Sequence, residues 1–273
     1  MAYHFKNLVF EGGGVKGIAY AGAMEVLDKE GIIPNVERVA GTSAGAMMAV
    51  LVGLRYSADE VKEILWDLNF KNFIDSSWGI VRDTTRLLKE YGWYKGDYFR
   101  NLMADFIKRK TGNGEATFKD LARSKQFRDI YLVGADLTTG LSQVFSAKNT
   151  PDVKVADAAR ISMSIPLFFA AVRGGEDNKH LFVDGGLLDN YAIKTFDQIR
   201  YVANKNHFRR TDYYDKINKK AKFKKDKKHS EYVYNKETLG FRLDSKETSP
   251  CSSRTGRHPA KRSTASSPTP RRW

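Results

Sequence analysis

The sequence predicts an α/β fold with a mainly parallel central sheet flanked by helices. Two successive units of strand, tight turn and helix fill the first 55 residues. Strands that alternate with helices usually pair in parallel, because the crossover helix returns the chain to the same end of the sheet. The second helix, Ala46–Leu54, is apolar nearly all round, so we expect it to be buried.

The first unit begins with the apolar run Asn7–Phe10, which predicts a strand. Glu11 and three glycines follow, and apolar residues at helical spacing then predict a helix over Val15–Asp28. In the second unit a strand predicted at Val36–Ala40 leads through Gly41–Gly45 into the buried helix.

Later segments continue the alternation of helices and strands. Helices are predicted over Ala58–Leu68, Asp97–Lys110, Thr117–Ala122 and Val155–Ser162. Strands are predicted over Ile130–Ala135, Gln143–Ser146 and Leu181–Val183. Residues 69–96 are irregular and rich in aromatic side chains, and the pattern assigns them no role.

The positive charge is concentrated at the C-terminal end. Residues 1–204 carry 26 Lys and Arg against 25 Asp and Glu, whereas residues 205–273 carry 20 against 7, a net +13 of the total +14. From Ser249 onward almost no apolar side chain remains to offset the entropy of ordering. We therefore predict a main domain over residues 1–204, a basic extension over 205–248 that could belong to it, and a disordered tail over 249–273.

The single cysteine, Cys251, excludes an intramolecular disulfide and any cysteine-rich metal site. The N-terminal apolar run is interrupted by Lys6 and Asn7 and is too short for a signal peptide, and no later stretch reaches about 18 apolar residues. The sequence thus predicts a cytoplasmic or peripheral membrane protein without a transmembrane helix. Secretion by a route that needs no signal peptide stays open.

The first chemical motif is Gly41-Thr42-Ser43-Ala44-Gly45, between a predicted strand and the buried helix. A serine on such a sharp turn needs small residues two places before and after it, because a Cβ there would collide with the strand or the helix. The motif, with Gly41 and Gly45 around Ser43, is typical of a nucleophile elbow. The alternative is that Ser43 only caps the helix.

The second motif, Gly12-Gly13-Gly14-Val15-Lys16-Gly17, also follows a strand and opens a helix. Glycines let backbone N–H groups approach an anion, and the helix N-terminus adds partial positive charge. The same spacing satisfies the dinucleotide-binding pattern GxGxxG, which also needs an acidic residue at the end of the second strand. That strand ends in Ala40 and GTSAG, which favours an oxyanion hole formed by Gly12, Gly13, Gly14, Lys16 and Gly17.

The third motif, Asp184-Gly185-Gly186, directly follows a predicted strand. The C-terminal ends of parallel strands share one edge of a sheet, so the glycine run, Ser43 and Asp184 could meet there. Asp-Gly is also a common turn sequence, and a simple turn is the alternative.

No histidine is well placed to act as the base of Ser43. In the chain order of α/β-hydrolases the histidine follows the aspartate. The candidates there lie in a basic segment that we expect to be loose: His207, His229 and His258. His4 and His180 precede Asp184 and are expected on the surface. We therefore predict that Asp184 acts directly as the base, in a Ser-Asp dyad.

The order GGGVKG, GTSAG and DGG within residues 5–195 resembles the patatin-like phospholipase family. Two further segments are similar, Ala158–Pro166 before the last predicted strand and Asp189–Tyr191 after the DGG motif. The resemblance implies a three-layer fold with the catalytic domain in residues 1–204. It also implies that Ser43 attacks an acyl ester, that Asp184 accepts its proton, and that the amides of Gly13 and Gly14 stabilise the oxyanion.

The sequence departs from the resemblance at one position of the glycine motif. Many members of the family carry arginine where this chain has Lys16, which keeps the charge and loses the planar guanidinium group. Tyr234–Asp244 is similar to a segment that occurs late in bacterial members.

The predicted activity is that of a serine lipid acyl hydrolase of the phospholipase A or lysophospholipase type, acting through an acyl-enzyme. No metal or cofactor is implied, and the expected partner is a phospholipid or another acyl lipid rather than nucleic acid. The basic segment, with aromatic residues interleaved, predicts a peripheral contact with anionic membrane or else a solvated tail. The alternative functions are a patatin-fold protein that binds lipid with little turnover and a nucleotide-binding regulatory module.

Overall fold

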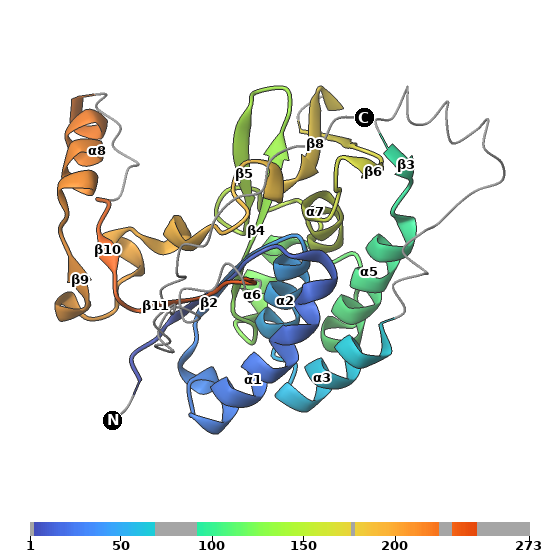
Figure 1. Ribbon diagram of the computed structural model, residues 1–273, viewed down its shortest axis with the longest axis horizontal. Helices are drawn as coiled ribbons and strands as arrows, with labels where there is room; N and C mark the ends of the chain where they lie inside the picture. Colours follow the sequence, from blue (N-terminus) through green and yellow to red (C-terminus); the bar gives the residue numbers. More distant parts are fainter. Residues whose placement is uncertain (1–2, 69–91, 176–177, 224–230, 245–273) are drawn as a thin grey trace, which may run out of the picture. The chain divides into compact units, whose positions relative to one another are not determined.

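The computed structural model describes residues 3–68, 92–175, 178–223 and 231–244. A seven-stranded sheet forms the centre of this part of the chain, in the order β11-β1-β2-β4-β8-β7, with β5 also paired to β4 (Figure 1). The strands are β1 Asn7–Phe10, β2 Arg38–Thr42, β4 Asp129–Asp136, β5 Leu141–Phe145, β7 Val172–Gly174, β8 His180–Asp184 and β11 Thr238–Phe241.

The sheet is mixed. Strands β11, β1, β2 and β4 pair in parallel, as the strand and helix units predict. Strands β5 and β8 run antiparallel to β4, and β7 runs antiparallel to β8. The α/β class with flanking helices is confirmed, whereas the strand that ends in Asp184 does not run in the predicted direction.

One face of the sheet is covered by helices. The helical segments that precede β8 in the chain include η1 Gly14–Ala19, α1 Tyr20–Lys29, α2 Ala44–Gly53, α3 Ala58–Asp67, α5 Asp97–Thr111, α6 Phe118–Ser124 and α7 Val155–Ser162. Every residue of α2 is buried, and α2 packs on β1, β2 and β4 (Figure 1). The predicted helix at residues 15–28 is divided, because the chain first forms the 3-10 turn η1 and only then the regular helix α1.

The opposite face of the sheet has a separate, smaller apolar cluster. Along β1 the side chains alternate, so that Leu8 and Phe10 join the main core while Val9 packs with this second cluster. Its other buried members are Ala40, Tyr131, Phe196 and Tyr201. The last two belong to the 3-10 turns Ile193–Phe196 and Ile199–Tyr201, so these turns cover the second face near β1, β2 and β4.

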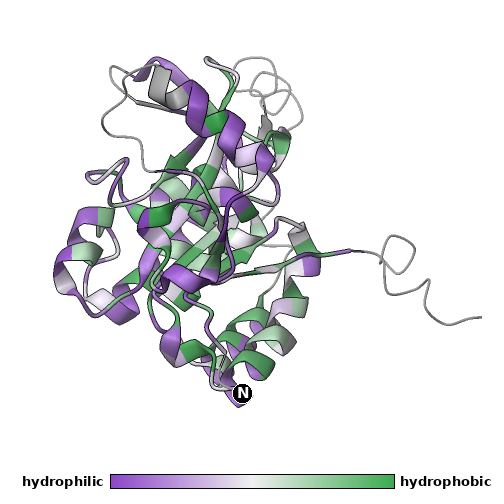
Figure 2. Cartoon of the chain, turned by 90° about the vertical axis from the view of Figure 1, so that its left-hand side faces the viewer, coloured by the Kyte–Doolittle hydropathy of each residue, from purple (hydrophilic) through white to green (hydrophobic). Residues whose placement is uncertain are grey.

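The basic segment contributes structure to the sheet itself. Helix α8, Asp212–Phe223, is mostly hydrophilic, as Figure 2 shows with the left-hand side of Figure 1 turned toward the viewer. Strand β11 then pairs with β1, with Phe241 opposite Phe10. The charge pattern of this segment gave no indication of either element.

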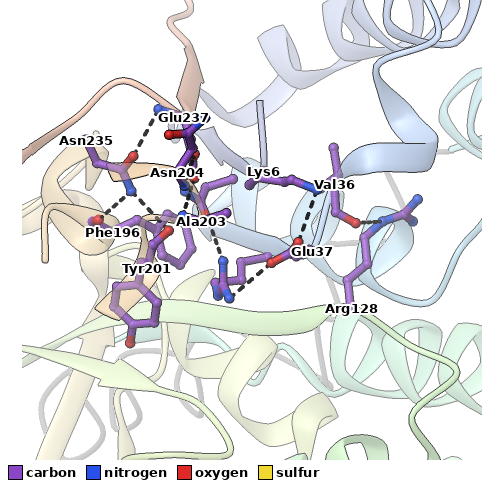
Figure 3. A network of polar contacts seen from close by, with 12 residues as sticks. Lys6, Val36, Glu37, Arg128, Phe196, Tyr201, Ala203, Asn204, Asn235 and Glu237 are labelled. Atoms are coloured by element: carbon purple, nitrogen blue, oxygen red, sulfur yellow. Dashed lines mark hydrogen bonds and ion pairs between the residues drawn. The ribbon is translucent and has the colours of Figure 1, made fainter. Parts of the chain in front are cut away.

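The buried carboxylate of Glu237, just before β11, binds the segment around residues 203–207. Glu237 accepts hydrogen bonds from the amides of Ala203 at 2.7 Å and Asn204 at 2.9 Å, and its other close partner is His207 Nδ1 at 2.9 Å. Asn235 continues the network, because its amide group donates to the Phe196 carbonyl at 2.9 Å (Figure 3). The buried polar side chains of Glu237 and Asn235 thereby have hydrogen-bond partners.

Some of the sequence-based expectations fall outside the described residues: those for most of the aromatic-rich region, for Cys251, His229 and His258, and for the tail over residues 249–273. In the part that the structure describes, no helix has the length and apolar content needed to cross a membrane.

Candidate active site

Ser43 lies between the end of β2 and the start of α2, with φ 55° and ψ −124°. This backbone conformation is rare for a residue with a side chain and marks a sharp turn. A Cβ on Gly41 would lie 2.0 Å from the Gly45 carbonyl oxygen, and a Cβ on Gly45 would lie 2.2 Å from the Phe10 carbonyl oxygen. Backbone packs directly on backbone at both positions, which explains why each holds glycine.

Asp184 reaches Ser43 because two strands meet end to end. Val133 of β4 pairs with Thr42 of β2, and the next residue, Gly134, pairs with Asp184 of β8. Strand β5 occupies the other side of β4 along both positions, so β2 and β8 lie on the same side. Ser43, the first residue after β2, therefore lies at the point where β8 ends in Asp184. The sequence-based reason for their proximity, a shared edge of parallel strands, is wrong for β8.

The Asp184 carboxyl is buried and receives few hydrogen bonds. Its Oδ1 accepts a hydrogen bond from the Gly186 amide at 2.7 Å. Burial raises the pKa of Asp184 to about 6, and hydrogen bonds from the Gly186 amide and the Ser43 hydroxyl oppose this rise. A carboxylate whose pKa lies near neutrality is a stronger base than a solvent-exposed aspartate and is still ionised at pH 7.

Two residues that the sequence did not single out support the serine. The Ser43 amide donates to Ser162 Oγ at 2.9 Å, and Ser162 Oγ donates to the Val133 carbonyl at 2.6 Å. The Ser43 hydroxyl also lies 3.5 Å from Met163 Sδ. Both residues fall in the segment Ala158–Pro166, whose similarity to the family was the available signal.

The glycine motif lies directly beside the elbow. A Cβ on Gly12 would lie 3.1 Å from Ser43 Cβ, and a Cβ on Gly17 would lie 3.0 Å from Ala44 Cβ. The Gly12 amide already donates to the Asn190 carbonyl at 3.0 Å. By contrast, the amides of Gly13 and Gly14 have no acceptor among the described residues.

The remaining predicted members of the oxyanion hole contribute differently. Gly14 has φ +54°, a conformation that favours glycine, and a Cβ there would meet nothing within 4 Å. The Lys16 amide donates to the Gly13 carbonyl at 3.1 Å, while its side chain is exposed. Lys16 therefore helps to close the turn, and its charge faces solvent.

An apolar cavity of about 290 Å³ opens next to these residues. Ala44, the residue after Ser43, and Met163 lie in its wall, and η1, α2, α3 and the segment Met163–Phe169 supply the rest. Met163 links the cavity to the nucleophile, because its Sδ also contacts the Ser43 hydroxyl. The size and lining suit an apolar chain.

The described histidines have partners away from the dyad. His180 Nδ1 lies 2.7 Å from Asp136 Oδ2, and His207 Nδ1 lies 2.9 Å from Glu237 Oε1, with the His4 ring 4.3 Å from the His207 ring. The expectation that His207 lies in a loose segment is wrong, because the buried Glu237 holds it. None of these three histidines has a hydrogen bond to Ser43 or Asp184.

In residues 3–68, 92–175, 178–223 and 231–244, no three His, Cys, Asp or Glu side chains come together in a way that could hold a metal ion.

Comparison with solved structures agrees with this architecture. VipD from Legionella pneumophila superposes with a TM-score of 0.53 and 20% sequence identity, over 68% of this chain and 47% of that chain. At this identity the likeness concerns the fold alone.

Sequence comparison identifies relatives and a family. The protein YqhO of Bacillus subtilis (strain 168) is 34% identical over 203 residues, which cover 70% of this chain and 67% of YqhO. The probable lipid hydrolase 463L of Invertebrate iridescent virus 6 is 23% identical over 204 residues, covering 74% of this chain and 66% of the viral protein. The family model described as patatin-like phospholipase matches residues 8–197, and the chain belongs to the patatin-like phospholipase family.

Proposed function

We propose that this chain is a serine lipid acyl hydrolase that cleaves fatty acyl esters through a Ser43–Asp184 dyad. The observation that carries the proposal is the junction of β2 and β8, where a strained serine meets a buried carboxyl whose pKa is raised to about 6. Membership of the patatin-like phospholipase family supports an acyl lipid as the substrate.

In the first step Asp184 takes the proton of the Ser43 hydroxyl as its Oγ bonds to the ester carbonyl carbon. The carbonyl oxygen becomes an oxyanion, which accepts hydrogen bonds from the amides of Gly13 and Gly14. Collapse of this tetrahedral intermediate breaks the ester C–O bond. The leaving alcohol takes the proton from Asp184, and the acyl group remains as an ester on Ser43.

The second step repeats the chemistry with water as the nucleophile. Asp184 takes a proton from a water molecule as the water oxygen bonds to the acyl carbon. The oxyanion forms again at the same two amides, and its collapse breaks the bond to Ser43 Oγ. Ser43 Oγ recovers the proton, and the products are a fatty acid and the free enzyme.

The apolar cavity is the proposed site for the acyl chain. It reaches Ser43 through Met163 and Ala44, and several of its lining side chains are also exposed to solvent, namely Val15, Ile18, Ile165 and Phe168. An acyl chain can therefore enter from a lipid surface without first crossing a polar layer. This arrangement supports a phospholipase A or lysophospholipase type of activity, in which a single chain is released.

We also propose that the basic segment makes a peripheral contact with anionic membrane. The aromatic side chains do not all take part, because Tyr214 is buried and its hydroxyl donates to Asp197. The exposed cations of the segment provide the attraction: Lys205, Arg209, Arg210, Lys216, Lys219 and Lys220. Each such charge near an anionic surface contributes about 1 kcal/mol.

Hydrolysis of a soluble fatty acyl ester tests the proposed activity. Ser43→Ala removes the nucleophile and should abolish turnover, while the circular dichroism spectrum and melting temperature stay near those of the wild type. Ser142→Ala, in the exposed part of β5, is the matched control and should keep full activity. Wild-type turnover by the Ser43 variant would reject the dyad, and binding of the ester without turnover by the wild type would indicate a lipid-binding protein.

A further inference from the structure

Two segments that are distant in sequence hold the glycine loop, residues 11–14. On one side the loop is tied to Asn190, a few residues beyond Asp184. The Gly12 amide donates to the Asn190 carbonyl at 3.0 Å, and Asn190 Nδ2 donates back to the Gly12 carbonyl at 3.1 Å. This side of the loop is thus hydrogen-bonded to the segment that follows Asp184.

On the other side the loop contacts the C-terminal strap, residues 238–243, which comprises β11 and the two residues after it. The Glu11 amide donates to the Phe241 carbonyl at 3.1 Å and extends the pairing of β1 with β11. The Leu243 side chain fills the space beside Gly13, since a Cβ on Gly13 would lie 2.5 Å from Leu243 Cδ1. The strap therefore forms a wall behind the first of the two unpaired amides.

The Glu11 side chain contacts both of the segments that hold the loop. Its Oε2 accepts a hydrogen bond from the Leu243 amide at 2.6 Å, and its Oε1 lies 3.4 Å from Asn190 Nδ2. The Glu11 carbonyl accepts a third hydrogen bond, from the buried Tyr20 hydroxyl at 2.6 Å. A charged acceptor on a backbone amide is among the stronger hydrogen bonds in proteins. The chain just before Gly12 is fixed at several points through this one residue.

We infer that Glu11 is a positioning residue that, through the Leu243 amide, holds the glycine loop so that the Gly13 and Gly14 amides face the oxyanion. The inference rests on the proposed function. It assigns a role in the site to the strap, which lies beyond residues 8–197, the part that the family model matches. Because the oxyanion forms only during the reaction, a displaced loop should slow turnover and leave ester binding nearly unchanged.

Kinetics on a soluble p-nitrophenyl ester test this role. Glu11→Leu removes the acceptor, and we expect kcat to fall about tenfold to a hundredfold with KM changed less than about twofold. Glu11→Gln keeps an oxygen that can accept from Leu243 and should recover most of kcat. The matched control is Glu25→Leu. It removes an exposed carboxylate of α1 that pairs with Lys62, and its kinetics should match those of the wild type. Unchanged kcat in Glu11→Leu, or equal losses in the Leu and Gln variants, overturns the inference.

Leu243 provides the complementary variants. Leu243→Pro removes the amide donor and should reproduce the loss seen in Glu11→Leu, whereas Leu243→Ala keeps the donor and controls for the lost side chain. The double variant Glu11→Leu with Leu243→Pro should be little worse than either single variant, because both break the same hydrogen bond. Additive losses in kcat would show that Glu11 does not act through Leu243.

Hydrogen exchange separates this inference from the proposed function, because it needs no substrate. The amides of residues 11, 12 and 16, which are hydrogen-bonded in the wild type, should exchange at least about tenfold faster in Glu11→Leu, while those of α5 should not change. Equal exchange in the two proteins overturns the inference even if the enzyme is active. Absence of ester hydrolysis by the wild type rejects the proposed function and leaves the exchange result to decide the role of Glu11.

Discussion

The elbow and the C-terminal segment meet at the glycine loop, but different forces stabilise them. From Arg38 to Gly53 the chain packs through apolar side chains and through bare backbone at Gly41 and Gly45. In the described residues between Asp197 and Leu243 it depends on buried polar side chains that bind backbone groups. Glu237 accepts from the amides of Ala203 and Asn204, Asn235 donates to the Phe196 carbonyl, and Asp197 accepts from the Asn235 amide. The first region needs close fit, and the second needs hydrogen-bond partners.

This difference predicts whether a substitution should change activity or stability. Within the site, a change that keeps the shape of a side chain can remove the chemistry and leave the fold intact. In the C-terminal segment, a change that keeps the shape of a buried side chain but removes its polar group breaks several hydrogen bonds at once and lowers stability. Measuring activity and the free energy of unfolding on the same variants therefore separates the two regions.

After removal of the Ser43 nucleophile itself, the largest effect is expected at Asp184. Asp184→Asn keeps the acceptor for the Gly186 amide but removes the base, so kcat on a soluble ester should fall about 10²- to 10⁴-fold. His207→Ala should remain active, because His207 is bound to Glu237 and has no contact with Ser43. A fully active Asp184→Asn, or an inactive but folded His207→Ala, would contradict the Ser-Asp dyad.

The pH dependence sharpens the same prediction. Only ionised Asp184 accepts the Ser43 proton, so kcat/KM of the wild type should fall about tenfold per pH unit below the pKa of about 6 and level off above it. The folded-state pKa is raised, so folding favours the protonated carboxyl, and Asp184 costs stability as pH rises from its unfolded pKa through about 6. Asp184→Asn should therefore gain more in melting temperature at pH 8 than at pH 4. An activity profile that is flat between pH 5 and pH 7 would count against this assignment.

A smaller effect, on stability rather than on chemistry, is expected at Glu237. Glu237→Leu leaves the amides of Ala203 and Asn204 without acceptors, and the free energy of unfolding should fall by about 3 kcal/mol in urea. The exposed neighbour Lys236→Leu is the control and should change it by less than about 0.5 kcal/mol. Equal stability of the two variants would show that the network does not hold the C-terminal segment.

The smallest effect concerns the exposed cations of α8. Replacing Lys216, Lys219 and Lys220 with Glu should weaken binding to anionic vesicles at least about tenfold in co-sedimentation, and raised salt should weaken wild-type binding in the same way. The control replaces exposed lysines elsewhere, Lys29, Lys108 and Lys125. If both triple variants lose binding equally, the attraction comes from net charge and not from this helix.

Local sequence patterns predicted part of the fold well. Helix α7 begins and ends at the predicted residues, and α2 is buried throughout. The first depends on apolar periodicity and the second on an unbroken apolar run, each within one short segment. The direction of β8 could not be predicted, since it depends on how β8 pairs with the distant strand β4 and not on its own residues. Strand β11 was missed for the same reason, because its structure depends on β1.

The candidate site divides in the same way. Ser43, Asp184 and the glycine motif stand in recognisable local patterns, and the structure brings them together. Ser162, Met163 and Asn190 lie in segments that resemble the family, but their contacts to Ser43 and Gly12 exist only after distant segments have packed. Glu11 adjoins the glycine motif, but its partner Leu243 lies at the opposite end of the described chain.

The central claim is that Ser43 is a nucleophile activated by Asp184, and fluorophosphonate labelling followed by peptide mass spectrometry tests it most directly. The reagent needs no knowledge of the lipid substrate, because it reports only a serine that is activated for attack. We predict one adduct, on the peptide that contains Ser43, with labelling much slower in Asp184→Asn and absent in Ser43→Ala. An adduct on a different serine, or labelling of Ser43 at the same rate in Asp184→Asn, would contradict the dyad.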